Sequence, residues 1–289
     1  MQATVGSGAH TLRPEAPPFR VAGMALQNGL LVHTPENWAA AIRAADGTMQ
    51  VASGPKPSRM AAGWAGRWPL LRGVAQMGDT LALLPLVKRR LAGALLPLES
   101  PRVAVAVGAA TLGGFLLRVG ERDGGGGSVL VQEVGAAALA LVPVAVALRG
   151  SQLARYHGAE HKVIGEFERA TAGLDGDAEK EHARCGSNLV APLLLANLAG
   201  NVVLRRVVRR PPPGAMLLTG LLSLAAAMEV FRWTTRHPEA PVARVLAKPG
   251  YWLQHSLTTA EPSEAQMEVG RAALGELLKA EGLQGASGA

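Results

Sequence analysis

Residues 129–148 read VLVQEVGAAALALVPVAVAL, a run with a single charge, Glu133, near its start. Three other stretches have the same character, namely residues 103–119, 189–204 and 214–231. As helices they are about 24–30 Å long, which suits a bilayer core of about 30 Å. Soluble helices of this length normally show a polar face, and these four do not. The sequence therefore predicts a mainly α integral membrane protein with about four apolar helices, rather than a soluble helical core.

The composition supports this fold class. Charged residues make up 18% of the chain, below the roughly 25% of an ordinary soluble domain. The formal net charge of +7 suits either anionic lipid or nucleic acid. However, the basic residues are spread near the ends of the apolar runs, without the basic and aromatic block that nucleic acid requires. Membrane lipid is the expected partner, and nucleic acid is not.

The remaining segments predict three regions. Residues 1–18 contain no apolar run, so we expect a disordered tail and no signal peptide. Residues 20–54 hold short apolar runs on both sides of Asp46-Gly47, which predicts a small β domain with a hairpin. Residues 60–289 are expected to form the helical membrane domain. Within residues 60–98 we expect a helical stretch broken near Pro69 and Pro85.

The charge pattern predicts a multi-pass protein of the cell (inner or plasma) membrane. The basic cluster at residues 88–90 places the start of the first apolar run in the cytoplasm. Both termini, a segment at residues 149–188 and a C-terminal helix at residues 263–280 are then expected to be cytoplasmic. If each apolar run crossed the membrane in turn, the arginines that follow the third run would lie outside the cell, against the preference of basic residues for the cytoplasmic side. That run contains Pro192 and can enter the membrane and return, so the number of crossings stays open.

The main chemical motif is His157-Gly158-Ala159-Glu160-His161, an H-x-x-E-H pattern. On a helix, His157 and His161 lie one turn apart on one face, where their ring nitrogens can share a metal ion. Glu160 lies beside them, and its carboxylate can accept a proton from metal-bound water. The alternative is a structural helix start in which the His and Glu side chains bond to each other.

A second cluster, His182 and Cys185, follows about 20 residues later, after a predicted turn. Together with His157 and His161, these side chains have the chemistry of a site for zinc or another divalent transition metal. We therefore expect Cys185, the single cysteine of the chain, to be reduced and to lie at the metal. The alternative is a buried structural cysteine beside a surface histidine.

Glu229 is a further candidate ligand. It lies near the end of an otherwise apolar run, and acids within membranes are costly and often functional. Its alternative role is an ion pair with Arg232 at the helix end. Glu166 and Glu168 lie nearer to the histidine motif in the sequence and are candidates for the same position.

The block RYHGAEHK at residues 155–162, together with residues 182–186, resembles the YqhQ-type family of bacterial membrane proteins. That family is catalogued as domain of unknown function 1385. The resemblance extends from about residue 22 to residue 279 and includes Asn28-Gly29 and Glu229. Members are often described as predicted metal-dependent enzymes, so the resemblance implies a membrane protein with this type of site. The chain departs from the family pattern at Asn28, His33 and Ala183.

Three functions remain open from the sequence. The first is a membrane-bound, metal-dependent hydrolase with Glu160 as the base, acting on a peptide, a lipid headgroup or a phosphoester. The second is a non-catalytic scaffold or assembly factor that binds a cytoplasmic protein partner, with a structural motif. The third is a transporter lined by polar residues of the apolar runs, which with only four runs requires a homo-oligomer. The candidate path is formed by Glu133, Asn197, Asn201 and Glu229.

Overall fold

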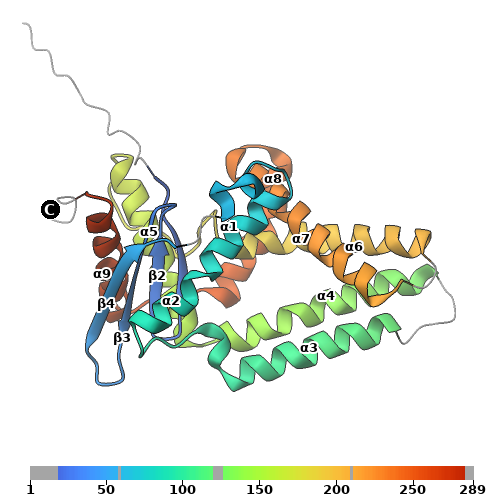
Figure 1. Ribbon diagram of the computed structural model, residues 1–289, viewed down its shortest axis with the longest axis horizontal. Coiled ribbons are helices and arrows are strands. Elements are labelled where there is room, and N and C mark those ends of the chain that lie inside the picture. The colour runs from blue at the N-terminus through green and yellow to red at the C-terminus, as the bar shows by residue number, and fades with distance from the viewer. Residues whose placement is uncertain (1–18, 58–59, 120–125, 209–210, 284–289) are drawn as a thin grey trace, which may run out of the picture.

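The computed structural model of the chain describes residues 19–57, 60–119, 126–208 and 211–283. It is mainly helical, with one small antiparallel sheet near the N-terminus, as the sequence predicts (Figure 1). The sheet and the long apolar helices occupy opposite ends of the molecule (Figure 1). The predicted disordered tail, residues 1–18, lies outside the described residues.

The sheet has four strands in sequence order, each antiparallel to the next. The predicted hairpin is confirmed, because Asp46 and Gly47 connect the last two strands. Gly47 has a φ of 84°, and an Asp46 carboxylate oxygen accepts a hydrogen bond from the Thr48 N–H at 2.9 Å. The strands are β1 (Ala22–Leu26), β2 (Gly29–His33), β3 (Asn37–Arg43) and β4 (Met49–Pro55).

Both faces of the sheet are covered, because alternate residues of a strand point to opposite sides. Leu30 packs in one core with helices α5 (Gln152–Thr171) and α9 (Glu264–Ala280). Its neighbour Leu31 packs in the other core, against α2 (Leu83–Arg90). The sheet therefore fixes the position of α5, the helix that carries the H-x-x-E-H motif.

Residues 60–98 form a helical stretch with two breaks, as the sequence predicts. Two short 3₁₀ turns, η1 (Met60–Ala62) and η2 (Trp64–Gly66), precede α1 (Leu71–Leu81), so the expected break near Pro69 is confirmed. The second predicted break, near Pro85, is also present, because α1 ends at Leu81 and α2 begins at Leu83. Pro85 lies in the first turn of α2, where a missing N–H breaks no intrahelical hydrogen bond.

The four predicted apolar helices are present. Three are long and apolar enough to cross a membrane, over Val131–Leu148, Gly186–Val207 and Pro213–Arg236, and a shorter apolar helix covers Pro101–Leu117. They extend away from the sheet as two neighbouring pairs, and this arrangement is compatible with a membrane protein (Figure 1). The full helices are α3 (Pro101–Val119), α4 (Gly126–Leu148), α6 (Val190–Val207) and α7 (Pro213–Arg236).

A buried polar cluster joins the two helix pairs. The Asn201 amide of α6 donates to the Glu133 carboxylate of α4 at 2.9 Å. Arg205 donates to the Gln132 side-chain oxygen at 2.8 Å and lies 3.7 Å from Glu133. These contacts satisfy polar groups that are costly within apolar helices. They give Glu133 and Asn201 a packing role that requires no transport path.

Candidate metal centre

Helix α5 presents the two motif histidines side by side. Its first turn is capped by Ser151, whose hydroxyl accepts a hydrogen bond from the Ala154 N–H at 3.1 Å. The spacing of four residues then places His157 and His161 one above the other, with ring centroids 4.4 Å apart. The predicted shared face is therefore present.

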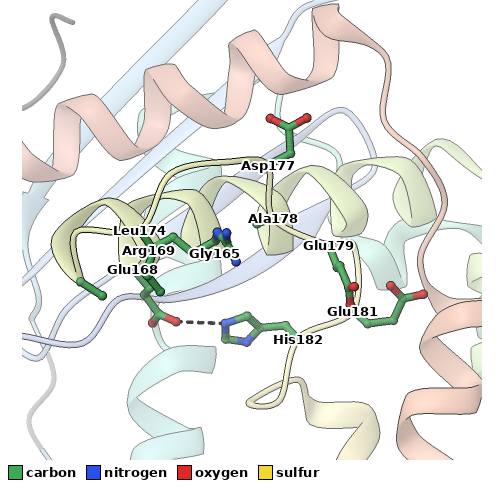
Figure 2. Close-up of a pocket in the computed structure, with 10 residues that line it drawn as sticks. Gly165, Glu168, Arg169, Leu174, Asp177, Ala178, Glu179, Glu181 and His182 are labelled. Carbon is green, nitrogen blue, oxygen red and sulfur yellow. Dashed lines mark hydrogen bonds and ion pairs between the residues drawn. The ribbon is translucent and has the colours of Figure 1, made fainter.

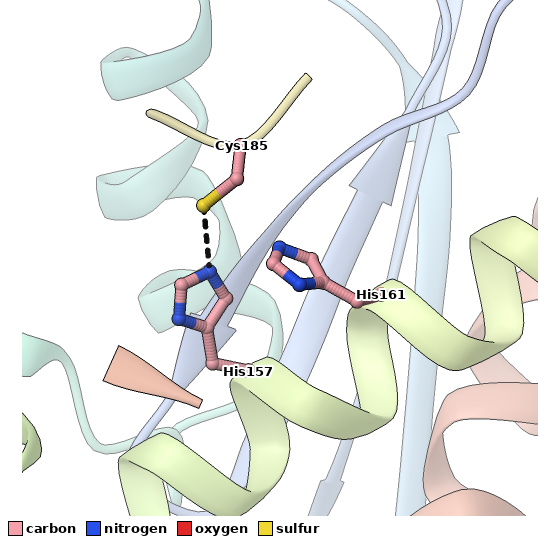
Figure 3. Close-up of side chains that lie close together, drawn as sticks. All are labelled: His157, His161 and Cys185. Carbon is pink, nitrogen blue, oxygen red and sulfur yellow. Dashed lines mark hydrogen bonds between the residues drawn. The ribbon is translucent and has the colours of Figure 1, made fainter. Parts of the chain in front are cut away.

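The loop between α5 and α6 brings Cys185 to the same place. Its Sγ lies 3.4 Å from Nε2 of His157, and one ligand atom from each of Cys185, His157 and His161 lies within 4.8 Å of the others (Figure 3). Within the described residues these three form the one such group of metal-ligating side chains. The predicted convergence of these three side chains is present, while metal binding itself stays a prediction.

Backbone carbonyl groups fix the orientation of both rings. Nδ1 of His157 lies 2.8 Å from the Thr258 carbonyl oxygen, and Nδ1 of His161 lies 2.5 Å from that of Lys180. A carbonyl only accepts, so each Nδ1 carries a proton, and in the neutral ring Nε2 then keeps its lone pair. Burial also lowers the pKa of His161, which favours the neutral ring. Metal-bound histidines usually have this arrangement.

Glu160 is buried between α5 and the sheet. One carboxylate oxygen lies 3.9 Å from Nε2 of His157, and burial raises the pKa of this carboxyl group. The side chain passes directly over Gly23 of β1, where an added Cβ would lie 2.5 Å from a Glu160 oxygen. Gly23 therefore makes room for the carboxylate, a role that the sequence alone did not indicate.

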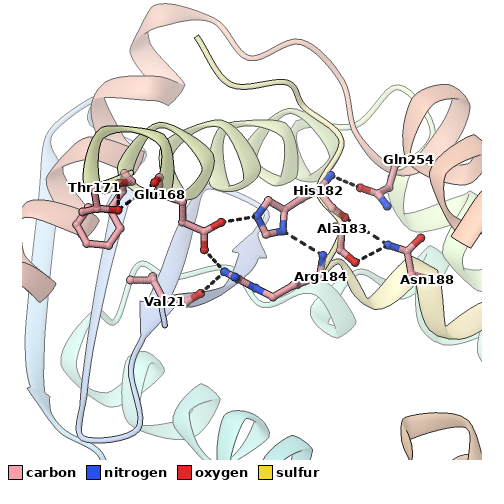
Figure 4. Close-up of polar contacts among 9 residues, drawn as sticks. Val21, Glu168, Thr171, His182, Ala183, Arg184, Asn188 and Gln254 are labelled. Carbon is pink, nitrogen blue, oxygen red and sulfur yellow. Dashed lines mark hydrogen bonds and ion pairs between the residues drawn. The ribbon is translucent and has the colours of Figure 1, made fainter. Parts of the chain in front are cut away.

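His182 lies beside the cluster rather than in it. Its ring centroid is 5.6 Å from that of His161, while its Nε2 is 3.3 Å from a Glu168 oxygen. Its Nδ1 accepts a hydrogen bond from the Arg184 N–H at 3.3 Å, and Arg184 also pairs with Glu168 (Figure 4). Both ring nitrogens therefore have partners other than a metal. Glu168 serves this network and is not brought to the three ligand candidates.

Glu229 is also placed elsewhere. It lies on α7 and pairs with Arg72 of α1, whose Nε donates to a Glu229 oxygen at 2.7 Å. The structure thus assigns it neither to the His157, His161 and Cys185 group nor to a hydrogen bond with Arg232. This ion pair connects α1 to α7.

A cleft of about 390 Å³ opens next to His182, between the second half of α5 and the loop that follows it (Figure 2). Glu168 and His182 are part of its lining, and the rest of the lining is half charged and half small or apolar. Because the His182 ring also neighbours His161, one side chain separates the cleft from the ligand group. The other lining residues are Gly165, Arg169, Ala172, Leu174, Asp177, Ala178, Glu179 and Glu181.

Comparison with known proteins gives a family but no activity. A family model described as "Protein of unknown function (DUF1385)" matches residues 137–280, which include α5 and Cys185. "Uncharacterized protein YqhQ" of Bacillus subtilis (strain 168) is 32% identical over 138 residues. The match covers 45% of this chain and 41% of that protein, so the chain spans about two fifths of this relative's length. No solved structure matches.

Proposed function

Residues 137–280 belong to the family described as protein of unknown function DUF1385, and we propose that this region holds a divalent transition metal, zinc above all, in a membrane-bound hydrolase. His157, His161 and Cys185 are the proposed ligands. One observation carries this proposal: the Nδ1–H groups of His157 and His161 each donate to a backbone carbonyl. Their Nε2 atoms are therefore directed toward the thiol of Cys185.

The donor set suits zinc, which binds imidazole nitrogen and thiolate sulfur in tetrahedral sites. Three protein ligands would leave one position for water, as in catalytic zinc sites, and a bound zinc would lower the pKa of that water. Cys185 is the single cysteine of the chain, so a disulfide within the chain does not compete for its sulfur. A structural site would normally have a fourth protein ligand, and His182 is engaged elsewhere.

Glu160 is the proposed general base. Its carboxylate lies on the same helix face as His157, at 3.9 Å from the ring nitrogen that would bind the metal. Burial raises its pKa, and a base whose pKa lies closer to neutral transfers protons more effectively. The reaction class is attack of water on a carbonyl or phosphoryl centre.

Burial of the group favours one alternative, a non-catalytic membrane scaffold or assembly factor with a structural metal. His161 is 2% exposed and Cys185 is 7% exposed, so both are nearly closed to solvent. A metal here would hold the Cys185 loop against α5 and stabilise a surface for a cytoplasmic partner. The two functions share the ligands and differ in the role of Glu160.

Glu160→Gln separates them. For the hydrolase, we expect the purified full chain to keep its metal and to lose at least about 100-fold in rate. The wild-type protein would be tested on a fluorogenic peptide, p-nitrophenyl acetate and bis-p-nitrophenyl phosphate. The variant would then be tested on each substrate that the wild-type protein hydrolyses. The control is Glu261→Gln, at an exposed carboxylate that pairs with Lys162. A metal-loaded wild type without turnover, or an unchanged rate in Glu160→Gln, would favour the structural role.

A further inference from the structure

The tryptophans of the chain are distributed unevenly. Of the five, Trp38 is 1% exposed and lies inside the sheet core. The others are exposed, with Trp64 at 71%, Trp68 at 62%, Trp252 at 66% and Trp233 at 41%. Large apolar side chains are seldom left open to water together unless another phase or molecule covers them. The phase or molecule that covers these four side chains is therefore relevant to the function of the protein.

Helix α8 (Pro241–Leu253) turns its apolar stripe outward. Val242, Val245 and Trp252, spaced by three and seven residues, are all exposed on one side. The side that faces the protein carries small or apolar residues, and there Gly250 packs directly on Asn188 of the turn η4 (Gly186–Leu189). A helix on a water-facing surface has the opposite pattern, with polar residues outside.

A second exposed apolar segment begins in η2. Trp64, Trp68 and Leu71 are spaced by four and three residues and are all exposed. This segment leads into α1, which is tied to the last third of α7 by the Arg72–Glu229 ion pair. Since α8 follows the same end of α7, both segments lie around one end of that helix (Figure 1).

We propose that these two segments, residues 64–71 and 241–253, form an interfacial collar that lies in the headgroup layer of the bilayer and binds anionic lipid. The collar is continuous with α7, one of the candidate membrane spans. Tryptophan and tyrosine are enriched at this depth in membrane proteins, because their rings are apolar and their N–H and O–H groups are polar. Amphipathic helices with a basic flank bind the same layer.

The charge of the collar fits an anionic headgroup layer. Arg67, Arg244 and Lys248 are exposed next to its apolar side chains, and Arg236 is exposed at the adjoining end of α7. Two of the acids beside the collar are paired with arginines, Glu239 with Arg244 and Glu229 with Arg72. Two others, Glu179 and Glu181, lie near Tyr251 of α8. Basic side chains near an anionic membrane surface favour binding to it.

The collar is connected to the metal-ligand group through the backbone. Helix α8 continues into the π-helical turn η5 (Gln254–Thr258). The Thr258 carbonyl accepts the Nδ1–H of His157, and the Gln254 side chain accepts the N–H of His182. A collar in the headgroup layer therefore holds these two histidines near the membrane surface. The lipid contact does not depend on the proposed hydrolase.

The test is quenching of tryptophan fluorescence by brominated lipids. The full chain would be reconstituted in phosphatidylcholine and phosphatidylglycerol vesicles with bromine near either the headgroup end or the methyl end of the acyl chains. Variants keep Trp252 or Trp68 alone, with Phe at the other four positions, and the matched control keeps buried Trp38 alone. We expect bromine near the headgroup end to quench Trp252 and Trp68 at least twofold more than bromine near the methyl end. Trp38 should not be quenched.

The wild-type protein gives a second measurement that needs no substitution, since the three tryptophans of the collar should be quenched by the shallow bromine. The anionic preference is tested with Arg244→Gln/Lys248→Gln, which should reduce the retention of co-purified phosphatidylglycerol relative to phosphatidylcholine. Quenching of Trp252 no greater than that of Trp38 would overturn the proposal and indicate a protein partner or a second copy on this surface. Stronger quenching by the deep bromine would place the segments in the hydrocarbon core and also contradict it. Unchanged lipid selectivity would remove the anionic preference.

Discussion

His161→Ala is expected to reduce bound transition metal from about one equivalent per chain to near zero, since three protein ligands are the fewest that zinc sites normally use. The ring of His161 is buried, and its Nδ1 is fixed by the Lys180 carbonyl, so its Nε2 is directed before any metal arrives. Neighbouring side chains do not replace it, because His182 is bonded to Glu168 and Arg184. Inductively coupled plasma mass spectrometry of the purified protein measures the change.

The matched control for this prediction is His237→Ala. His237 is exposed at the end of α7, where it stacks on Trp233, and it lies outside the ligand group. This variant should keep the wild-type metal content. Cys185→Ser should behave like His161→Ala, because a hydroxyl is a poor zinc ligand. Full metal retention in both His161→Ala and Cys185→Ser would exclude this group as the site.

Gly158→Ala is the second substitution with a large expected effect. A Cβ at this position would lie 2.1 Å from the Ala260 carbonyl oxygen, which is backbone and moves only with its segment. Ala260 is also held by the hydrogen bond from its N–H to the Ala154 carbonyl at 3.0 Å. The clash should cost about 1–3 kcal/mol of unfolding free energy. Displacing nearby Thr258, the acceptor for His157, should also weaken metal binding about 10–100-fold.

The control for Gly158→Ala is Gly275→Ala on α9. Both glycines lie inside helices, but a Cβ at Gly275 has no neighbour within 4 Å. Alanine there should raise helix stability by up to about 1 kcal/mol. Thermal melting in detergent and competition for metal with a chelator measure both quantities. Equal stability and affinity in Gly158→Ala and wild type would show that the contact with Ala260 is not required.

Much of the fold follows directly from sequence pattern. The apolar runs predict α3, α4, α6 and α7 because the membrane core demands length and low charge. The Asp46-Gly47 pair predicts the hairpin because its glycine adopts a positive φ. The break near Pro85 falls at Ala82, because proline is tolerated in the first turn of the helix that follows.

The candidate site was only partly predictable. His157, His161 and Cys185 were identified because zinc ligands belong to few residue types and the helix spacing is regular. The carbonyls of Thr258 and Lys180 were missed because any residue can supply a backbone oxygen, so they have no sequence signature.

Two acids show the same limit. Glu229 was a candidate ligand from its place in an apolar run, but its partner, Arg72, lies 157 residues away in sequence. Glu160 was correctly placed beside His157, but its contact with Gly23 depends on how the sheet packs on α5. Contacts between distant segments are set by packing, and spacing within one helix does not report them.

The most direct test of the metal centre is X-ray absorption spectroscopy of the purified full chain, prepared without chelator from cells supplied with zinc. The account predicts about one zinc per chain, with one sulfur at about 2.3 Å from Cys185 and two nitrogens at about 2.0–2.1 Å from His157 and His161. Cys185→Ser should contain near-zero zinc and therefore give no such spectrum. A protein free of transition metal, or a bound metal surrounded by oxygen and nitrogen alone, would contradict it.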